Sequence, residues 1–199
     1  MSKSGNQSPR DVVTITHTRE IGAQEMEKAA TLKTGVKLFL LILSILALDF
    51  VSKGMINFFI QPIQHAPNFF PFGGVSVFQN FFGIDFCIHH VTNRGAAWGI
   101  GSGLQDLLLI VRIAVVLGLV IYLRNSPKAR EYRYPLAMIV AGGLGNILDY
   151  FIYGHVIDMF HLFFWGYSYP VFNIADASIF LGIAWLLFHS FMRKKHANP

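Results

Sequence analysis

Four long apolar segments alternate with polar ones along the chain, at 38–60, 107–123, 134–152 and 174–191. Each is close to the ~20 residues that a helix needs to cross ~30 Å of hydrocarbon. Inside lipid the backbone polar groups must be satisfied within the segment itself, which favours helices. The pattern therefore predicts a membrane protein built around a bundle of four transmembrane α-helices.

Polar side chains interrupt all four apolar segments. They are Asp49 and Lys53 in the first, Arg112 in the second, Asn146 and Asp149 in the third, and Asp176 in the fourth. Because ionisable groups are costly at membrane depth, they usually face a bundle interior or a wet cavity. We therefore expect these side chains to point inward, away from lipid.

The composition supports a membrane protein, since 53% of the 199 residues are hydrophobic and only 14% are charged. Thirteen Lys and Arg residues lie before the first segment, between the second and third, or after the fourth, whereas only Arg94 lies in the opposite loops. This asymmetry predicts that both termini are cytoplasmic. The formal charge of +5 is thus explained by basic residues that orient the chain in the membrane. Because these residues do not form one basic face, we expect no nucleic-acid partner.

Residues 1–33 are polar and show only one possible short helix, at 23–33. We expect a flexible cytoplasmic tail there, followed by a transmembrane domain at 34–195. A cleaved signal peptide is not expected, because the polar lead is too long and the apolar run continues past Asp49.

Cysteine and histidine positions suggest no metal centre. Cys87 is the single cysteine, so it has no partner for an intrachain disulfide, and no Cys or His spacing matches a structural zinc site. We expect His89, His90 and His155 to lie at the surface or the membrane interface, and we expect neither a metal nor a cofactor.

The first outer loop contains an alternating stretch, FGIDFCIHHV, at 82–91. Ile84, Phe86 and Ile88 recur with a period of two, which predicts a half-buried strand, and NRG at 93–95 predicts a turn. The loop is rich in aromatic residues, so we expect a small periplasmic β-sheet at the lipid headgroups. For the second outer segment, 153–170, we expect an interfacial amphipathic half-helix that brings Asp158 to the membrane boundary.

The acidic side chains fall at a similar depth. With a rise of ~1.5 Å per residue, Asp49, Asp149 and Asp176 lie about 18, 22 and 24 Å from the cytoplasmic ends of their helices. Asp158 follows the third helix. All four carboxyl groups are therefore expected in the outer half of the bilayer or just above it.

Few cations are available for these carboxyl groups. Lys53 follows Asp49 by one turn and can pair with it, while Asp149 could be neutralised by Arg94 or held by Asn146. Two acids, Asp158 and Asp176, then have no evident cation. Two such carboxyl groups brought together would share one proton, the arrangement that activates water in aspartic proteases.

Simpler interpretations remain for the same residues. Asp176 or Asn173 could only cap a helix, and Asp158 could be a solvated interfacial acid. Asn93 could only form a turn. The ion pair of Asp49 and Lys53 is expected to be structural, and the small residues Gly142, Gly143 and Gly145 most simply permit close helix packing.

Several motifs resemble, in order and spacing, those of bacterial lipoprotein signal peptidases, also called signal peptidase II. They are LDFVSK at 48–53, TNRGAAWG at 92–99, GGLGNILD at 142–149, VIDMF at 156–160 and FNIADASI at 172–179. The resemblance covers residues 38–192. It implies an intramembrane aspartic endopeptidase that removes the signal peptide from diacylglyceryl-modified prolipoproteins, cutting before the lipid-modified cysteine.

The resemblance also implies roles for individual residues. Asp158 and Asp176 correspond to the catalytic pair. Substrate-binding or supporting positions correspond to Asp49, Lys53, Asn93, Gly95, Asn146, Asp149 and Asn173. No metal or cofactor is implied, the partners are prolipoprotein substrates and membrane lipids, and we expect a monomer in the bacterial inner membrane with the site near the outer leaflet.

One position departs from the family pattern. Members usually have arginine directly after the aspartate of the third motif, where this chain has Tyr150. A tyrosine cannot supply a guanidinium fork, so substrate contact there is either lost or supplied elsewhere, with Arg94 as a candidate.

The alternative function is a small membrane transporter or channel that uses the buried carboxylates.

Overall fold

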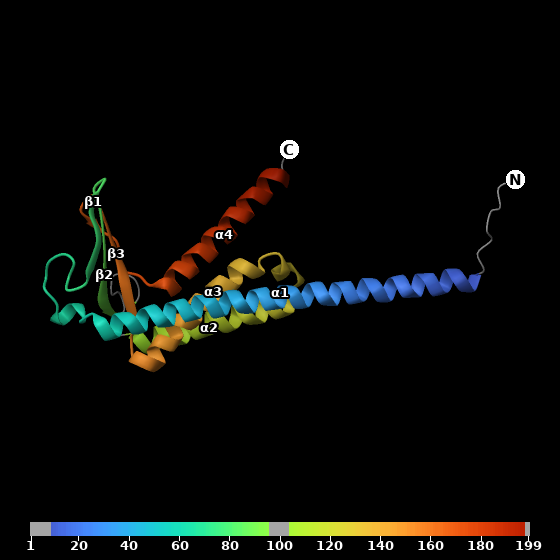
Figure 1. Cartoon of the computed structure of the whole chain (residues 1–199), viewed down its shortest axis with the longest axis horizontal. Helices are drawn as coiled ribbons and strands as arrows, with labels where there is room; N and C mark the ends of the chain where they lie inside the picture. Colours follow the sequence, from blue (N-terminus) through green and yellow to red (C-terminus); the bar gives the residue numbers. More distant parts are fainter. Residues whose placement is uncertain (1–8, 96–103, 198–199) are drawn as a thin grey trace. The chain divides into compact units, whose positions relative to one another are not determined.

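The computed structural model describes residues 9–95 and 104–197. The chain forms two compact units, Met1–Leu40 and Leu41–Pro199. The strands of the described residues all belong to the second unit, as Figure 1 shows.

The first helix, α1 (Pro9–Phe59), is continuous over 51 residues. The expected flexible tail is therefore helical from Pro9 onward, well beyond the short helix predicted at 23–33. Residues 23–33 consist mainly of Ala, Glu, Lys, Met and Leu, which favour helices, and no proline interrupts the segment before Phe59. The boundary between tail and peptidase domain at residues 33 and 34 stays a prediction.

Among the described residues, four helices are long and apolar enough to cross a membrane, which confirms the predicted bundle. By length and composition, the candidate spans lie within Gln24–Phe59, Gln105–Asn125, Arg133–Tyr153 and Ile174–Arg193. They belong to α1, α2 (Gln105–Asn125), α3 (Arg133–Tyr153) and α4 (Ile174–Ala197). Large apolar side chains such as Ile110, Leu117 and Phe180 are exposed, as lipid-facing positions should be.

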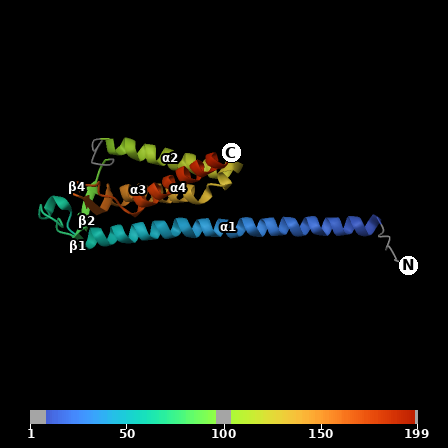
Figure 2. The same ribbon diagram turned by 90° about the horizontal axis from the view of Figure 1, so that it is seen from above.

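The central helix of the bundle is α3. In the most apolar stretch of 18 residues of α3, 44% of the residues are buried. The corresponding share is 6% in α2 and 17% in α4. It packs against both α2 and α4, and Figure 2 shows these three helices alongside one another. The polar residues of α3 are thereby held within protein rather than lipid.

Two glycines of α3 permit close approach, as expected from the sequence. A Cβ at Gly142 would collide with the backbone carbonyl oxygen of Ala175 in α4, and a Cβ at Gly145 would lie 2.7 Å from Oδ2 of Asp49. The absence of side chains at these positions therefore lets α4 and a carboxylate of α1 reach α3.

Four antiparallel strands form one sheet in chain order. They are β1 (Val75–Phe81), β2 (Ile84–Asn93), β3 (Val156–Phe164) and β4 (Tyr167–Ser168). The central pair β2 and β3 joins the two outer segments of the chain, and these strands lie side by side in Figure 1. The predicted strand within 82–91 and the small sheet are confirmed.

The predicted half-helix at 153–170 is wrong, because this segment forms β3 and β4. Gly154 adopts a left-handed conformation, with φ of 74°, and ends α3. The following residues then pair with β2 along most of its length, which satisfies an edge that would otherwise carry unpaired backbone groups. Side chains alternate between the two faces of β3, so Ile157 and Met159 pack on Ile56 of α1 while Asp158 lies between them in sequence.

Candidate active site

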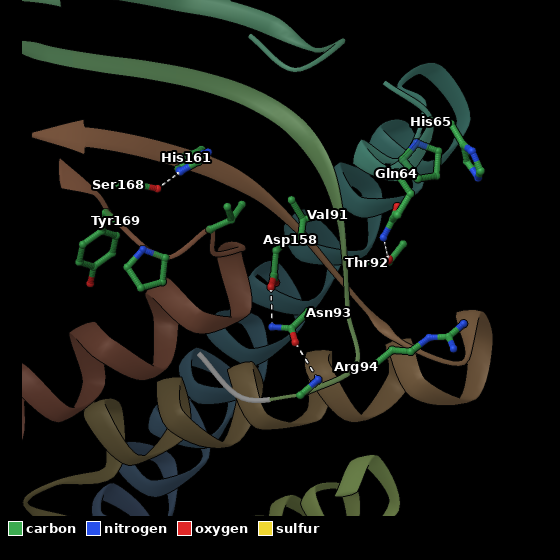
Figure 3. A pocket seen from close by; sticks show the side chains of 14 residues that line it. Gln64, His65, Val91, Thr92, Asn93, Arg94, Asp158, His161, Ser168 and Tyr169 are labelled. Carbon is green, nitrogen blue, oxygen red and sulfur yellow. Dashed lines mark hydrogen bonds between the residues drawn. The ribbon is translucent and has the colours of Figure 1, made fainter. Parts of the chain in front are cut away.

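Asp158 is a buried carboxyl group on β3, with 2% of its surface exposed. Its Oδ2 accepts a 2.8 Å hydrogen bond from the side-chain amide of Asn93 on β2, and its Oδ1 accepts a 2.7 Å bond from the amide of Asn173. Figure 3 shows Asp158 pointing to Asn93 inside a cavity. Asp158 is thus not a solvated interfacial acid.

Asp176 lies in the first turn of α4 and belongs to a reciprocal capping pair. Its backbone N–H donates to Oδ1 of Asn173 at 2.8 Å, and its Oδ2 accepts from the backbone N–H of Asn173 at 3.3 Å. This is the capping-box arrangement, which satisfies two free N–H groups of a helix start. The capping interpretation therefore holds, and it leaves Oδ1 of Asp176 to accept a 2.7 Å bond from Asn146.

Asn173 joins the two acids. Its side-chain nitrogen donates to Asp158, and its side-chain oxygen and backbone N–H both bind Asp176. Within residues 9–95 and 104–197, neither carboxylate forms a salt bridge. The structure therefore brings together the two acids that the sequence leaves without a cation.

Lys53 holds the remaining two acids. Its ammonium nitrogen lies 2.6 Å from Oδ2 of Asp49 and 2.7 Å from Oδ2 of Asp149, and it donates to Oδ1 of Asn146 at 3.2 Å. The predicted pair of Asp49 and Lys53 is confirmed. The suggestion that Arg94 neutralises Asp149 is wrong, because Lys53 does so from α1.

The acids around Lys53 also bind backbone. Oδ1 of Asp49 accepts from the N–H of Ala175 at 2.8 Å, and Oδ2 of Asp149 accepts from the N–H of Ile157 at 3.3 Å. These bonds fix the residues directly before Asp176 and Asp158. The Lys53 cluster thus positions both candidate acids without contacting them through a salt bridge.

Asn93 both forms the turn and donates a hydrogen bond to Asp158. Its Oδ1 accepts a 2.9 Å bond from the N–H of Gly95, while its amide nitrogen donates to the carboxylate. In Figure 3 the exposed Arg94 side chain is directed away from Asp158. The remainder of this motif, 96–99, lies outside the described residues.

The environment of Asp158 favours its protonated form. Burial raises the pKa of its carboxyl from 3.8 to about 7, and the nearby charge of Asp176 adds to this effect. The hydrogen bonds from Asn93 and Asn173 act in the opposite direction. A carboxyl of this kind can donate or accept a proton near neutral pH.

Each of these two acids lines a different cavity. One, of about 780 Å³, is lined by Asp158, Asn93 and His161, among others. The other, of about 770 Å³, is lined by Asp176 and Arg112 together with mostly apolar side chains: Val156, Leu162, Phe164, Phe172, Phe180 and Leu181. Asn93 lines both cavities, so it lies between them.

Tyr150, which stands where the family usually has arginine, makes a contact of its own, and an arginine from another helix lines the apolar cavity. The hydroxyl of Tyr150 donates to Asp106 at 2.5 Å, which joins α3 to α2. The guanidinium in the apolar cavity is that of Arg112, which donates to the carbonyl of Gly95 at 3.5 Å. Sequence reasoning recognised Arg112 only as an interruption of a helix, because its direction depends on how α2 is rotated.

Two of the three histidines expected at the surface are buried. His89 is 0% and His90 1% exposed, whereas His155 is half-buried. Nδ1 of His90 lies 2.9 Å from the carbonyl oxygen of Ile60 and so joins the sheet to the end of α1. A register shift between Ile88 and Val91 places both residues at a bulge of β2, which the two-residue period does not reveal.

Comparisons with known proteins identify the family of the chain. The family model described as signal peptidase (SPase) II matches residues 41–192. A lipoprotein signal peptidase of Chlamydia trachomatis is 35% identical over 159 residues, 79% of this chain and 92% of that protein. One from Anoxybacillus flavithermus is 38% identical over 104 residues, 52% of this chain and 62% of that protein.

The fold is also similar to solved structures. One bacterial membrane enzyme determined by the in meso method has a TM-score of 0.63 and 25% identity, covering 82% of this chain and 92% of its own. A second such structure has a TM-score of 0.60 and 27% identity. Because the family match extends over most of the second compact unit and includes both candidate acids, the chain belongs to the signal peptidase II family of proteases.

Proposed function

We propose that the chain removes signal peptides from diacylglyceryl-modified prolipoproteins by an aspartic mechanism, with Asp158 and Asp176 as the catalytic pair. Membership of the family makes the chain a protease acting on prolipoproteins. The observation that carries the aspartic mechanism is the link through Asn173 between two buried carboxyl groups, neither of which has a salt bridge among the described residues.

The chemistry requires one ionised and one neutral carboxyl. The ionised group accepts a proton from a water between the pair, and the water oxygen attacks the scissile carbonyl carbon. The neutral group donates a hydrogen bond to the carbonyl oxygen, where negative charge develops. The amide C–N bond then breaks, and the leaving amine takes up the proton that the first carboxyl accepted. No covalent bond to the enzyme is formed.

The supporting residues divide into two groups by what they touch. Asn93 and Asn173 donate to Asp158, and Asn146 donates to Asp176, so they hold the acids in place for a bound water. Asp49 and Asp149 anchor the neighbouring backbone, and Lys53 pairs with both of them. Gly95 fixes the Asn93 side chain. We propose that none of this second group reacts with substrate.

The two cavities suggest how the substrate lies. The apolar cavity with Phe180 and Leu181 suits acyl chains of the lipid-modified cysteine, and Arg112 offers a donor for its polar linkage. The cavity that contains Asp158 and Gln64 is lined with more polar side chains and suits the peptide. The scissile bond would then lie where the cavities meet, beside Asn93.

The chain would act as a monomer in the bacterial inner membrane. The four apolar helices make it a multi-pass membrane protein, and the Lys and Arg asymmetry supports cytoplasmic termini. In that orientation the sheet lies on the periplasmic side and the acids lie near the outer leaflet. Membrane lipids would surround the exposed apolar side chains of α2 and α4.

The test is cleavage of a diacylglyceryl-modified prolipoprotein by membranes that contain each variant, followed as a gel shift. We expect Asp158→Asn and Asp176→Asn each to lower the cleavage rate on the order of 10⁴-fold or more, because neither amide can exchange the required proton. Asp85→Asn is the matched control. Among the described residues, the Asp85 carboxylate accepts a hydrogen bond only from the backbone N–H of Asn80, in the β1–β2 hairpin.

Cleavage at the rate of the control in either variant would remove that aspartate from the pair. The transporter alternative is not favoured by the family match, and the same variants separate it from proteolysis in proteoliposomes. Ion flux that persists without both acids while cleavage is absent in the wild type would favour transport.

A further inference from the structure

Three metal-ligating side chains gather on the sheet, apart from the candidate catalytic acids. Cys87 and His89 lie on β2, and His161 lies on β3 directly opposite Cys87. All three are buried, with 0%, 0% and 8% of their surfaces exposed. Their possible ligand atoms lie within 4.8 Å of one another.

The spacing is close to that of a metal centre. Nε2 of His89 lies 3.0 Å from Nδ1 of His161. Two imidazole nitrogens on one tetrahedral zinc ion, each about 2.0 Å from the metal, are separated by about 3.3 Å. The two rings therefore need to part by only a few tenths of an ångström, and the thiol must approach by about 1 Å.

The ring nitrogens of the two histidines that face away from the cluster differ in their contacts. Nδ1 of His89 is buried and has no hydrogen-bond partner among the described residues. The outer nitrogen of His161, Nε2, lies 2.8 Å from the hydroxyl of Ser168. Ligating histidines commonly have such a partner, which fixes the orientation of the ring.

The surroundings would exclude water yet leave an entrance. The centre of the Phe72 ring lies 5.2 Å from the ring centre of His89 and 5.8 Å from that of His161. The ring centres of Phe163 and His161 are 4.0 Å apart. His161 and Ser168 also line the cavity of about 780 Å³. Figure 3 shows this pair at one side of that cavity, so an ion can reach the cluster from there.

We propose that Cys87, His89 and His161 form a zinc-binding site that joins β2 to β3. One sulfur and two imidazole nitrogens match the ligands that Zn²⁺ prefers and do not match the oxygen ligands of Mg²⁺ or Ca²⁺. When the zinc–sulfur bond forms, the S–H bond breaks and its proton passes to solvent. The fourth ligand position is left for water or a cavity group.

His161 of the proposed zinc site lies three residues after Asp158 on β3. A bound ion would fix β3 at His161, and this restricts the strand that carries Asp158. The site does not supply the water-activating groups of the proposed reaction. Its presence can therefore be tested without measuring cleavage, and its failure leaves the proposed function unaffected.

The test is Co²⁺ binding to the full-length chain in detergent, purified without a polyhistidine tag. Cys87 is the single cysteine of the chain, so a thiolate-to-cobalt absorption band can come only from this site. We expect the band at one Co²⁺ per chain, displacement by Zn²⁺, and no displacement by Mg²⁺. Cobalt binding without the band, or no binding at all, would overturn the proposal.

Variants assign the other ligands. His89→Gln and His161→Gln should each weaken Zn²⁺ binding on the order of 100-fold, and Ser168→Ala about tenfold. His155→Gln is the matched control, because this histidine lies outside the cluster. Affinity unchanged in a ligand variant would remove that residue from the site. If a variant does not fold, the wild-type cobalt band still decides the proposal.

Discussion

At the scale of single residues, Asn173 has several functions in the candidate site. It caps α4, donates to Asp158 and contacts Asn146. The sequence allows Asp176 to cap a helix and to act in catalysis, and the structure shows how both are possible, because Asp176 uses different oxygens for them. Oδ2 completes the capping box and Oδ1 faces Asn146.

The raised pKa of Asp158 predicts a pH-dependent stability. The pKa is 3.8 ordinarily and about 7 in the folded chain. A group whose folded pKa is raised contributes stability that is fully present below its unfolded pKa and is lost as the pH rises through the folded value. Asp158 therefore contributes most below about pH 4, and this contribution is lost by about pH 8.

Asp158→Asn removes this titration and is the means to observe it. Relative to the wild type, the variant should gain thermal stability as the pH rises from about 5 to about 8. The measurement is the difference in unfolding midpoint between the two proteins in detergent across that range. A difference that is constant with pH would contradict the raised pKa.

At the scale of elements, the Lys53 cluster joins α1, α3, β3 and the start of α4. Removing one partner of a buried ion pair leaves an uncompensated charge, which costs about 3–5 kcal/mol. Lys53 is 0% exposed and neutralises two carboxylates. The elements that carry the candidate acids therefore depend on a single ammonium group.

Lys53→Met is expected to lower the free energy of unfolding by about 3–5 kcal/mol, as measured by denaturant titration in detergent. The control is the triple variant Asp49→Asn, Lys53→Met and Asp149→Asn, which leaves no unpaired charge and should recover most of the loss. A triple variant no more stable than Lys53→Met would show that packing, rather than charge, accounts for the effect.

Close helix packing predicts a contrast between two glycines. A Cβ at Gly142 would meet the backbone oxygen of Ala175 and lie 2.8 Å from Cγ1 of Ile179, whereas a Cβ at Gly118 would meet nothing within 4 Å. Gly142→Ala should therefore destabilise the chain by about 1–3 kcal/mol. Gly118→Ala should be neutral or stabilising by up to ~1 kcal/mol, because alanine favours helices.

Thermal unfolding of both glycine variants checks this contrast. Equal midpoints for the two proteins would mean that α3 and α4 are not packed as closely as the structure has them. The test also bears on the site, because Ala175 directly precedes Asp176.

At the scale of the whole molecule, the family match begins at residue 41, where the second compact unit also begins. All the residues of the candidate site belong to that unit. A chain that starts with methionine before Thr34 still contains the apolar segment 38–60. This segment is long enough for a membrane-spanning helix.

The shortened chain is therefore expected to cleave prolipoprotein within about a factor of two of the full-length rate, since all the residues of the candidate site and the whole family match lie after the deletion. The comparison uses equal amounts of membrane-inserted protein, measured by immunoblot. Loss of cleavage at equal insertion would show that residues 1–33 take part in the reaction.

How much the sequence predicts differs from element to element. The four membrane helices follow from apolar length, and β2 follows from alternation. β3 cannot be predicted in this way, because the sequence of this segment is also compatible with a helix. Only its pairing with β2 makes it a strand. Likewise, Lys53 can be paired with Asp49 from a spacing of one turn, whereas its contact with Asp149 depends on how α1 and α3 pack.

By itself, the sequence determined the number of apolar spans, because apolar length is a local property. The orientation of the chain and the depth of its carboxyl groups stay predictions. The tertiary structure decided which acids meet, which cation pairs with Asp149, and that Cys87 and His89 lie beside His161. These contacts join residues far apart in the chain. They depend on helix rotation and strand register, which no local pattern specifies.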